Sequence, residues 1–308
     1  SEEQMLKWRK VVNYVHKYSK SKIGIQLGHS GRKGSVNVPS VGNNIPLAKH
    51  GWDLISASPI PFNEAMAIPK EMSVSDMDNI ISEFVNATIF AEEAGFDMIE
   101  LQAHHGFLLA SFLSPLTNIR KDEFGGSIQN RIKFPLQVFQ AMREVFPENK
   151  PMSVRISASD WAENGISESE VLFICEAFKN AGADIINVST GNTVENQQPQ
   201  IGRMWQTPFS DMIRNTIHVP TITTGYIQDI DQINTLLLNG RADLIALGRP
   251  LLLDPNFVRH AQAYEKYEPT DIPNQYKAGI SHLYPWHQSQ RNAVEAMKKA
   301  LKPESHKP

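Results

Sequence analysis

Apolar and polar positions follow one another along this chain in a regular rhythm. Short runs rich in apolar and β-branched residues recur between longer segments whose apolar residues are spaced for one face of a helix. The short runs predict strands at 23–27, 97–101, 152–156, 184–188, 221–224 and 243–247. The longer segments predict helices near 75–95, 128–146, 167–181, 207–217 and 228–239, and another within the first 22 residues. Strands that alternate with helices are typical of βα units and a parallel sheet.

Residues at the ends of the predicted helices support this pattern. Ser73 or Ser75 precedes the helix near 75–95, and Ser167 precedes the helix near 167–181. A serine at such a position accepts hydrogen bonds from the free amides of the first turn. Three helices run into a glycine before the next strand, in "EEAGFD", "KNAGAD" and "LNGRAD". Glycine closes a last helical turn well because it adopts the left-handed conformation easily.

The number of predicted strands sets the fold class. Six strands with their helices fit an α/β fold of the (β/α)8 TIM-barrel type, which needs eight strands to close. The first helix carries Leu6, Val11, Val12 and Val15 on one face and resembles the helix before a third strand. We therefore predict a barrel domain at 1–265 that lacks its first two strands, and a peripheral C-terminal extension at 266–308. The chain is then either a piece of a larger protein or a barrel that closes in an unusual way.

The segment 28–72, rich in Gly, Pro, Ser and Asn, predicts a long loop of the kind that serves as a lid or binding loop. An incomplete barrel leaves strand edges and core side chains exposed, which favours association into a homo-oligomer.

Composition narrows the class of protein. The chain has 308 residues, of which 41% are hydrophobic and 20% charged, with a formal net charge of −3. These values are ordinary for a soluble globular protein and indicate neither nucleic-acid binding nor a membrane span. Cys175 is the single cysteine, so we expect a reducing, cytoplasmic setting and a buried thiol within a helix.

Two late strands end in residues that suit a phosphate group. The segments "TTGYIQD" and "ALGRPLL" place Gly225, Gly248 and Arg249 at the ends of the last two predicted strands. In α/β barrels these loops commonly bind phosphate. Gln26 and Arg155 end two earlier strands, where an amide suits a heterocyclic edge and a guanidinium suits an anionic ring. Together these residues fit flavin mononucleotide (FMN) across the mouth of a barrel.

Several stretches resemble the old yellow enzyme family of FMN-dependent NAD(P)H oxidoreductases. They are "GIQLGHSGRKG", "AGFDMIELQAHHGFLLASFLSPLTNIRKDEFGGSIQNR", "SVRISASDW" and "NGRADLIALGRPLL". The resemblance runs from about residue 20 to residue 255 and is most specific over 95–135. The segment "IGRMWQTPFSDMIRN" is most similar to the reductase half of bifunctional aminobenzoyl-CoA or salicylyl-CoA monooxygenase/reductases, in which a monooxygenase domain precedes the barrel.

The resemblance implies a set of cofactor contacts. In such a barrel FMN takes hydride from NAD(P)H at N5 and passes it to an alkene conjugated to a carbonyl. The contacts implied are Gln26 on the pyrimidine edge, Arg155 on the N1/O2 side, Ser189 along the same groove, and Gly225, Gly248 and Arg249 on the phosphate. The "DEFGGS…NR" residues Asp122, Gly125, Gly126 and Arg131 are read as architectural, fixing the loop and helix after the fourth barrel strand.

The histidine pair in "IELQAHHGFL" falls on the family's substrate motif. In the family, two residues bind the substrate carbonyl oxygen and a tyrosine often delivers the proton. By position these are Gln102, His105 and Phe107, so one ligand is replaced by an amide and the phenol is absent. Strand alternation would place Gln102 and His104 on one face and His105 on the other unless a turn breaks it. We predict His105, ahead of His104, as the oxyanion ligand. A metal site is disfavoured because adjacent histidines point apart.

These observations favour an ene-reductase-type FMN enzyme acting on a small molecule, such as an aromatic or enoyl CoA thioester. The alternative is a flavin-free, degenerate barrel that serves as a module of a larger protein. Phe107, Gln102 and the short N-terminal part favour the alternative, whereas Gln26, Arg155, Gly248 and Arg249 favour the enzyme. A metal-dependent hydrolase would need carboxylates and histidines at several strand ends.

Overall fold

The computed structural model describes residues 1–38, 40–42, 44–267 and 272–300. Its main feature is a parallel sheet of six strands in the order β1-β4-β5-β6-β7-β8. The strands are β1 (Gly24–Leu27), β4 (Met98–Ala103), β5 (Met152–Ser157), β6 (Ile185–Ser189), β7 (Thr221–Thr223) and β8 (Leu244–Ile245). The sheet is open, with β1 at one edge and β8 at the other. This arrangement confirms the predicted α/β class and the six-stranded part of a barrel.

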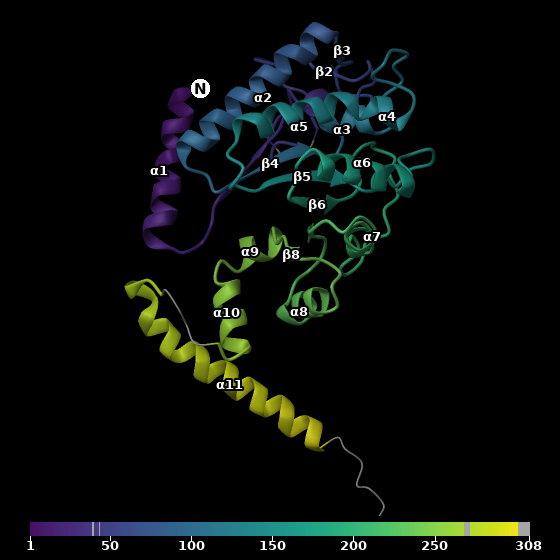
Figure 1. Cartoon of the computed structure of the whole chain (residues 1–308). Coiled ribbons are helices and arrows are strands. Elements are labelled where there is room, and N and C mark those ends of the chain that lie inside the picture. The colour runs from purple at the N-terminus through teal and green to yellow at the C-terminus, as the bar shows by residue number, and fades with distance from the viewer. Residues whose placement is uncertain (39, 43, 268–271, 301–308) are drawn as a thin grey trace, which may run out of the picture.

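Helices connect successive strands and lie on one side of the sheet, where α2, α5, α6, α7 and α8 follow one another around its outer surface (Figure 1). These helices are α2 (Val74–Ala94), α5 (Lys133–Val145), α6 (Glu168–Asn180), α7 (Thr207–Ile217) and α8 (Ile230–Leu238). The first helix, α1 (Glu2–Tyr18), precedes β1 and packs against α2. Short helices α3 (Leu108–Leu113) and α4 (Ile128–Arg131) lie between β4 and α5.

The two faces of the sheet differ in character. Along β4, Ile99, Leu101 and Ala103 are buried in the hydrophobic core, which fills the space between the sheet and the helices. The alternate residues Glu100 and Gln102 belong to the opposite face, because successive side chains of a strand point to opposite sides. This second face corresponds to the inside of a barrel and carries the polar residues of the candidate site.

Helix ends are closed largely as predicted. Ser73 and Ser167 cap α2 and α6, each within a capping box completed by an acidic residue three positions later. Ser75 lies inside α2 instead. Gly95, Gly182 and Gly240 all have positive φ angles, between 65° and 98°, where the helices end.

Some predicted boundaries were wrong. The helix expected near 128–146 is divided at Ile132 into α4 and α5. The strand expected over 243–247 is only two residues long. The loop expected over 28–72 contains a 3-10 turn, η1 (Gly31–Lys33), and a small parallel sheet of β2 (Ile55–Ser56) and β3 (Lys70–Glu71).

Residues read as architectural do hold the segment after β4. Asp122 pairs with the buried Arg120 at 2.5 Å and accepts a hydrogen bond from the backbone of Phe124. Arg131 is buried, donates to the carbonyl of Leu113 and pairs with Glu170. Cys175 is fully buried in α6, as predicted, and burial raises the pKa of its thiol.

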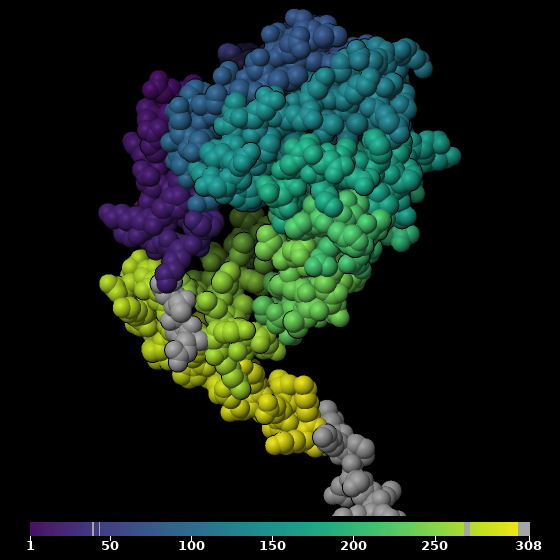
Figure 2. Space-filling view, in the orientation of Figure 1, coloured from purple at the N-terminus to yellow at the C-terminus, as the bar shows by residue number. Residues whose placement is uncertain are grey.

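After β8 the chain forms α9 (Arg249–Leu253), α10 (Phe257–Tyr264), η2 (Asn274–Tyr276) and α11 (Lys277–Ala300). Helix α11 packs against α10 and projects from the rest of the molecule (Figure 2). It covers most of the extension predicted as peripheral, and 301–308 lie outside the described residues. The proposed boundary near 265 stays a prediction. No helix in the described part of the chain is long and apolar enough to cross a membrane.

Candidate active site

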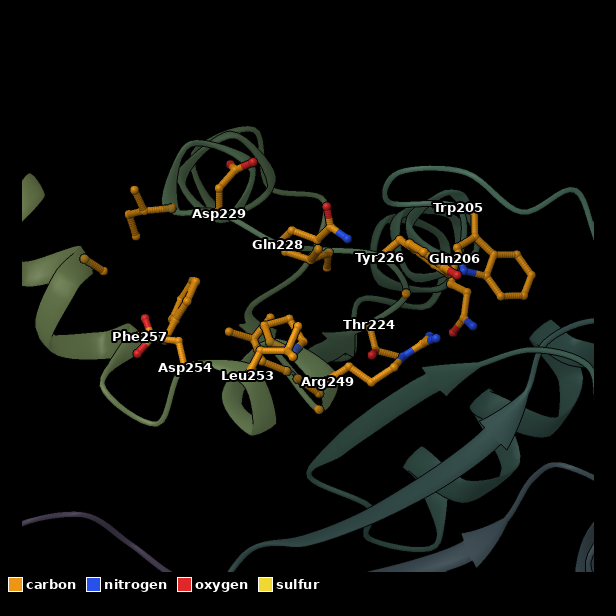
Figure 3. Close-up of a pocket in the computed structure, with 18 of the residues that line it drawn as sticks. Trp205, Gln206, Thr224, Tyr226, Gln228, Asp229, Arg249, Leu253, Asp254 and Phe257 are labelled. Carbon is orange, nitrogen blue, oxygen red and sulfur yellow. The ribbon is translucent and has the colours of Figure 1, made fainter. Parts of the chain in front are cut away.

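A cavity of about 1100 Å³ opens where the strands β4 to β8 end. Six residues singled out from the sequence line it: His105, Arg155, Ser189, Gly225, Gly248 and Arg249. Trp205 and Gln206 lie toward one end of the cavity, and Asp254 and Phe257 lie toward the other (Figure 3). His287 of α11 also lines the cavity, so the C-terminal extension reaches this site, which was not predicted from the sequence.

His105 reaches the cavity because the chain turns sharply after β4. Its φ angle is +55°, and its backbone N–H donates to Ser157 Oγ at 2.9 Å. Its ring Nε2 lies 2.6 Å from Ser189 Oγ, at the end of β6. Burial, together with the nearby charges of Arg155 and Lys33, lowers the pKa of His105 to about 3. The imidazole is therefore neutral at ordinary pH, and its one ring N–H can donate a hydrogen bond.

His104 lies behind this surface. It is 3% exposed, and its Nδ1 has no hydrogen-bond partner among the described residues. Its ring centroid is 4.1 Å from that of His105 and 5.9 Å from that of Phe107. Burial, with His105, Arg155 and Lys33 as smaller causes, lowers the pKa of His104. The turn thus separates the two histidines: His105 lines the cavity, and His104 packs under it as a neutral ring.

Arg155 places a guanidinium with an unpaired N–H at the cavity wall. Its Nε is buried without a hydrogen-bond partner among the described residues. Burial lowers the pKa of its guanidinium, and Glu100 opposes that shift. Arg155 is partly exposed, and a guanidinium whose buried Nε lacks a hydrogen-bond partner suits an anionic ligand.

Two further buried polar groups line the same cavity and were missed from the sequence. Thr190 Oγ1 and Gln206 Oε1 have no hydrogen-bond partner in the described structure. Thr190 follows β6, and Gln206 lies just before α7. The position of Thr190 next to Ser189 was the available signal, whereas Gln206 lies in a loop without periodicity. Unpaired polar atoms beside Arg155 fit a ligand with several oxygen and nitrogen atoms, such as FMN.

The loops after β7 and β8 form the other side of the cavity. Gly225 and Gly248 both line it, and Gly248 directly precedes α9. The guanidinium of Arg249 lies 4.8 Å from the ring centroid of Tyr226 and extends toward Gln206 (Figure 3). This combination of glycine backbone and a fixed cation suits a phosphate group.

Gln26 and Gln102 do not line the cavity beside His105. The amide of Gln102 donates to Gln26 Oε1 at 3.1 Å, and Gln26 donates to Glu100 Oε1 at 2.7 Å. Gln26 lies on β1, the edge strand of the sheet, and Gln102 lies on the neighbouring strand β4. The pair expected to bind one oxyanion is therefore divided: His105 contacts Ser189, and Gln102 contacts Gln26.

Lys33 braces the turn that carries His105. Its ammonium donates to the backbone oxygens of His105 and Asn192, each at 3.0 Å. It also lies 5.3 Å from the ring centroid of Phe107, the residue that replaces the family's tyrosine. Burial, with a smaller effect of Arg32, lowers the pKa of Lys33 to about 8. The turn is thus held by side chains from three other parts of the sheet and its loops.

Residues 1–267 match the model of the NADH:flavin oxidoreductase / NADH oxidase family. The chain belongs to this family. Its members use FMN with NADH or NADPH, which confirms the predicted enzyme class and cofactors. The chain is 40% identical over 274 residues to the NADPH dehydrogenase of Clostridium acetobutylicum, covering 88% of this chain and 75% of that protein. It is 37% identical over 281 residues to the NADPH dehydrogenase of Bacillus subtilis, covering 91% and 77%.

Solved structures of similar fold agree with this membership. Histamine dehydrogenase from Rhizobium sp. 4-9 superposes with a TM-score of 0.71 at 26% identity, covering 86% of this chain and 37% of that chain. Morphinone reductase superposes with a TM-score of 0.67 at 23% identity, covering 85% and 70%. The closer similarity to the bifunctional monooxygenase/reductases stays a prediction.

The described residues contain no group of three or more histidine, cysteine, aspartate or glutamate side chains placed to hold a metal ion.

Proposed function

We propose that this chain is an FMN-dependent NAD(P)H reductase of small molecules that carry an alkene conjugated to a carbonyl. The observation that carries the proposal is the cavity in which the neutral His105 and the unsatisfied Arg155 face the glycine loops and Arg249. Bound FMN would supply hydride transfer from NAD(P)H to the acceptor.

The protein's own groups would bind and orient the reactants. Arg249 and the backbone at Gly225 and Gly248 would hold the phosphate, and Arg155 would stabilise negative charge at the ring. Thr190 and Gln206 would complete the contacts of the cofactor. His105, held by Ser157 and Lys33 through its backbone, would donate a hydrogen bond to the carbonyl oxygen of the acceptor and polarise the alkene.

After hydride transfer, the other carbon of the alkene needs a proton. With Phe107 in place of the family's tyrosine, no phenol at this position can supply it. His105 and His104 are poor acids here, because a histidine with a strongly lowered pKa carries no spare proton at neutral pH. We propose that water supplies this proton, and that acceptors which do not depend on a protein acid are reduced fastest.

Other parts of the proposal concern the setting of this activity. We propose an aromatic or enoyl CoA thioester as acceptor, a cytoplasmic location, and an N-terminal monooxygenase domain in the parent protein. The open edges at β1 and β8 favour a homo-oligomer. Size-exclusion chromatography with light scattering tests the last point.

The second candidate is a flavin-free module of a larger protein. The observation that favours it is the division of Gln102 from His105, together with Phe107 in place of a phenol. This reading predicts no flavin binding at all.

The visible absorption spectrum of the purified chain, before and after addition of FMN, separates the two candidates. A bound-flavin spectrum that bleaches anaerobically with NADPH or NADH supports the reductase. No bound flavin at excess FMN supports the module. Reoxidation of the bleached flavin by 2-cyclohexenone then tests the acceptor class.

A further inference from the structure

The polar face of the sheet is organised around one carboxylate. Glu100, on β4, accepts hydrogen bonds from Gln26 on β1 at 2.7 Å, from Ser153 on β5 at 2.5 Å and from Asn187 on β6 at 2.9 Å. Four of the six strands thus meet at this side chain. The sequence analysis assigned no role to Glu100 itself.

A carboxylate determines which end of a neighbouring side-chain amide, the NH₂ group or the oxygen, faces it. An ionised carboxylate only accepts hydrogen bonds, so the side chain of Gln26 must turn its NH₂ group toward Glu100. The oxygen of Gln26 then faces Gln102, which must turn its own NH₂ group toward it. Glu100, Gln26 and Gln102 thus form a row of hydrogen bonds. The order of donors and acceptors along this row is fixed by Glu100, even though an isolated amide could lie either way.

Gly28 supports the far end of the row. A β-carbon at Gly28 would lie 2.3 Å from Gln102 Oε1, so the absence of a side chain there leaves room for this amide. With its oxygen against Gly28 and one N–H on Gln26, Gln102 keeps one N–H that is unused among the described residues. Gln26 likewise keeps one N–H that has no partner in the described part of the chain.

We propose that Glu100 is a positioning residue that makes Gln26 and Gln102 a pair of hydrogen-bond donors toward the ligand of this face. The pair would then suit a carbonyl oxygen or an unprotonated ring nitrogen, as a flavin pyrimidine edge offers, in preference to a ring N–H. The inference rests on the proposed function only for the identity of that ligand, because the direction of the amides follows from this chain's own contacts.

A side-chain amide spectrum tests the direction without any cofactor. The full chain is labelled with ¹⁵N-glutamine, and the amide signals of Gln26 and Gln102 are assigned by their loss in Gln26→Ala and Gln102→Ala. We expect the signals of both amides to shift in Glu100→Gln, which can donate to Gln26 and so reverse the row. Glu176→Gln, on the exposed surface of α6, is the matched control and should leave both in place. Unchanged signals in a folded Glu100→Gln would overturn the proposal.

The Gln26→Ala variant keeps the test decisive if Glu100→Gln does not fold. Gln26 is exposed on the edge strand, so its removal should be tolerated. The proposal requires the amide signals of Gln102 to move in this variant, because their acceptor is lost. If they stay where they were, no directed row exists.

FMN titration adds the link to the ligand. We expect Glu100→Gln to weaken FMN binding about 10-fold, which corresponds to roughly 1.4 kcal/mol, and Glu176→Gln to leave it unchanged. An FMN affinity equal to that of the unmodified chain would refute the role toward flavin. If the unmodified chain itself binds no FMN, the proposed function fails, whereas the amide spectra still decide the role of Glu100.

Discussion

The middle strands and the last strands of this sheet hold their functional side chains in different ways. Strands β5 and β6 are six and five residues long, and their ends fix His105 through Ser157 and Ser189. Strands β7 and β8 are three and two residues long. The helix that follows β8 leaves Leu252 and Leu253 82% and 88% exposed. One half of the cavity is thus preorganised by hydrogen bonds between strands, and the other is weakly packed.

The difference fits the tasks proposed for the two halves. Polarising a carbonyl oxygen requires a donor placed within a few tenths of an ångström, so His105 benefits from support by several strands. A phosphate group can be held by glycine backbone and one arginine, and its binding then stabilises the segment that holds it. Hence the largest effects of mutation on FMN affinity should come from the weakly packed half.

Removing the cation of that half should have the largest effect. Arg249→Ala should weaken FMN binding roughly 100-fold, because charge-assisted hydrogen bonds to phosphate contribute up to about 3 kcal/mol. Quenching of FMN fluorescence on titration measures the affinity. Arg9→Ala, on α1, serves as the control. Equal affinities of Arg249→Ala and the unmodified chain would place the phosphate elsewhere and end the contrast between the halves.

Restoring a phenol tests the preorganised half. Phe107→Tyr should speed reduction of 2-cyclohexenone about 100-fold, the low end of the contribution expected from a positioned general acid. Reduction of ferricyanide, which needs no proton from the protein, should stay unchanged in the same variant. Stopped-flow reoxidation of the reduced flavin measures both. An equal gain with both acceptors would contradict a role as acid.

Arg155→Met should separate binding from stability. Without ligand, the variant loses a partly buried guanidinium whose Nε lacks a partner in the described structure, so the melting temperature should rise by roughly 2 °C. FMN affinity should fall by about 10-fold. Thermal unfolding with and without FMN measures the two effects, with the exposed Arg203→Met as control. A fall in stability without ligand would mean that Arg155 serves the fold alone.

The buried histidines should make the stability of the chain depend on pH. The pKa values of His104 and His105 lie below the ordinary value of 6.5 in the folded chain, so the unfolded chain binds more protons below that pH. Stability should therefore fall as pH decreases from about 6.5 toward 3. Urea unfolding at pH 7 and pH 5 measures this loss. The slope should be smaller in His104→Phe and unchanged in the exposed His282→Gln; parallel slopes in all three proteins would contradict the burial argument.

Local patterns in the sequence were enough to predict most of the fold. Alternation and helical spacing depend on near neighbours, so the six strands and the main helices could be placed from residue types alone. Ser73, Ser167 and the three terminal glycines act within one helical turn, and their roles could be read in the same way. The family motifs then assigned the cofactor, because Arg155, Gly248 and Arg249 lie at strand ends that any barrel brings to one edge.

The directions of side chains at that edge were decided only by tertiary contacts. Alternation alone could not choose between His104 and His105, because the choice depends on a turn held by Ser157, Ser189 and Lys33. Gln102 turns toward Gln26, and Gln206 and His287 line the cavity. These placements likewise depend on residues far away in the chain. The sequence by itself thus determined which elements form and which family they belong to. The orientation of each polar group was left to contacts between strands, because a side chain at a strand end takes its direction from whichever neighbour satisfies its hydrogen bonds.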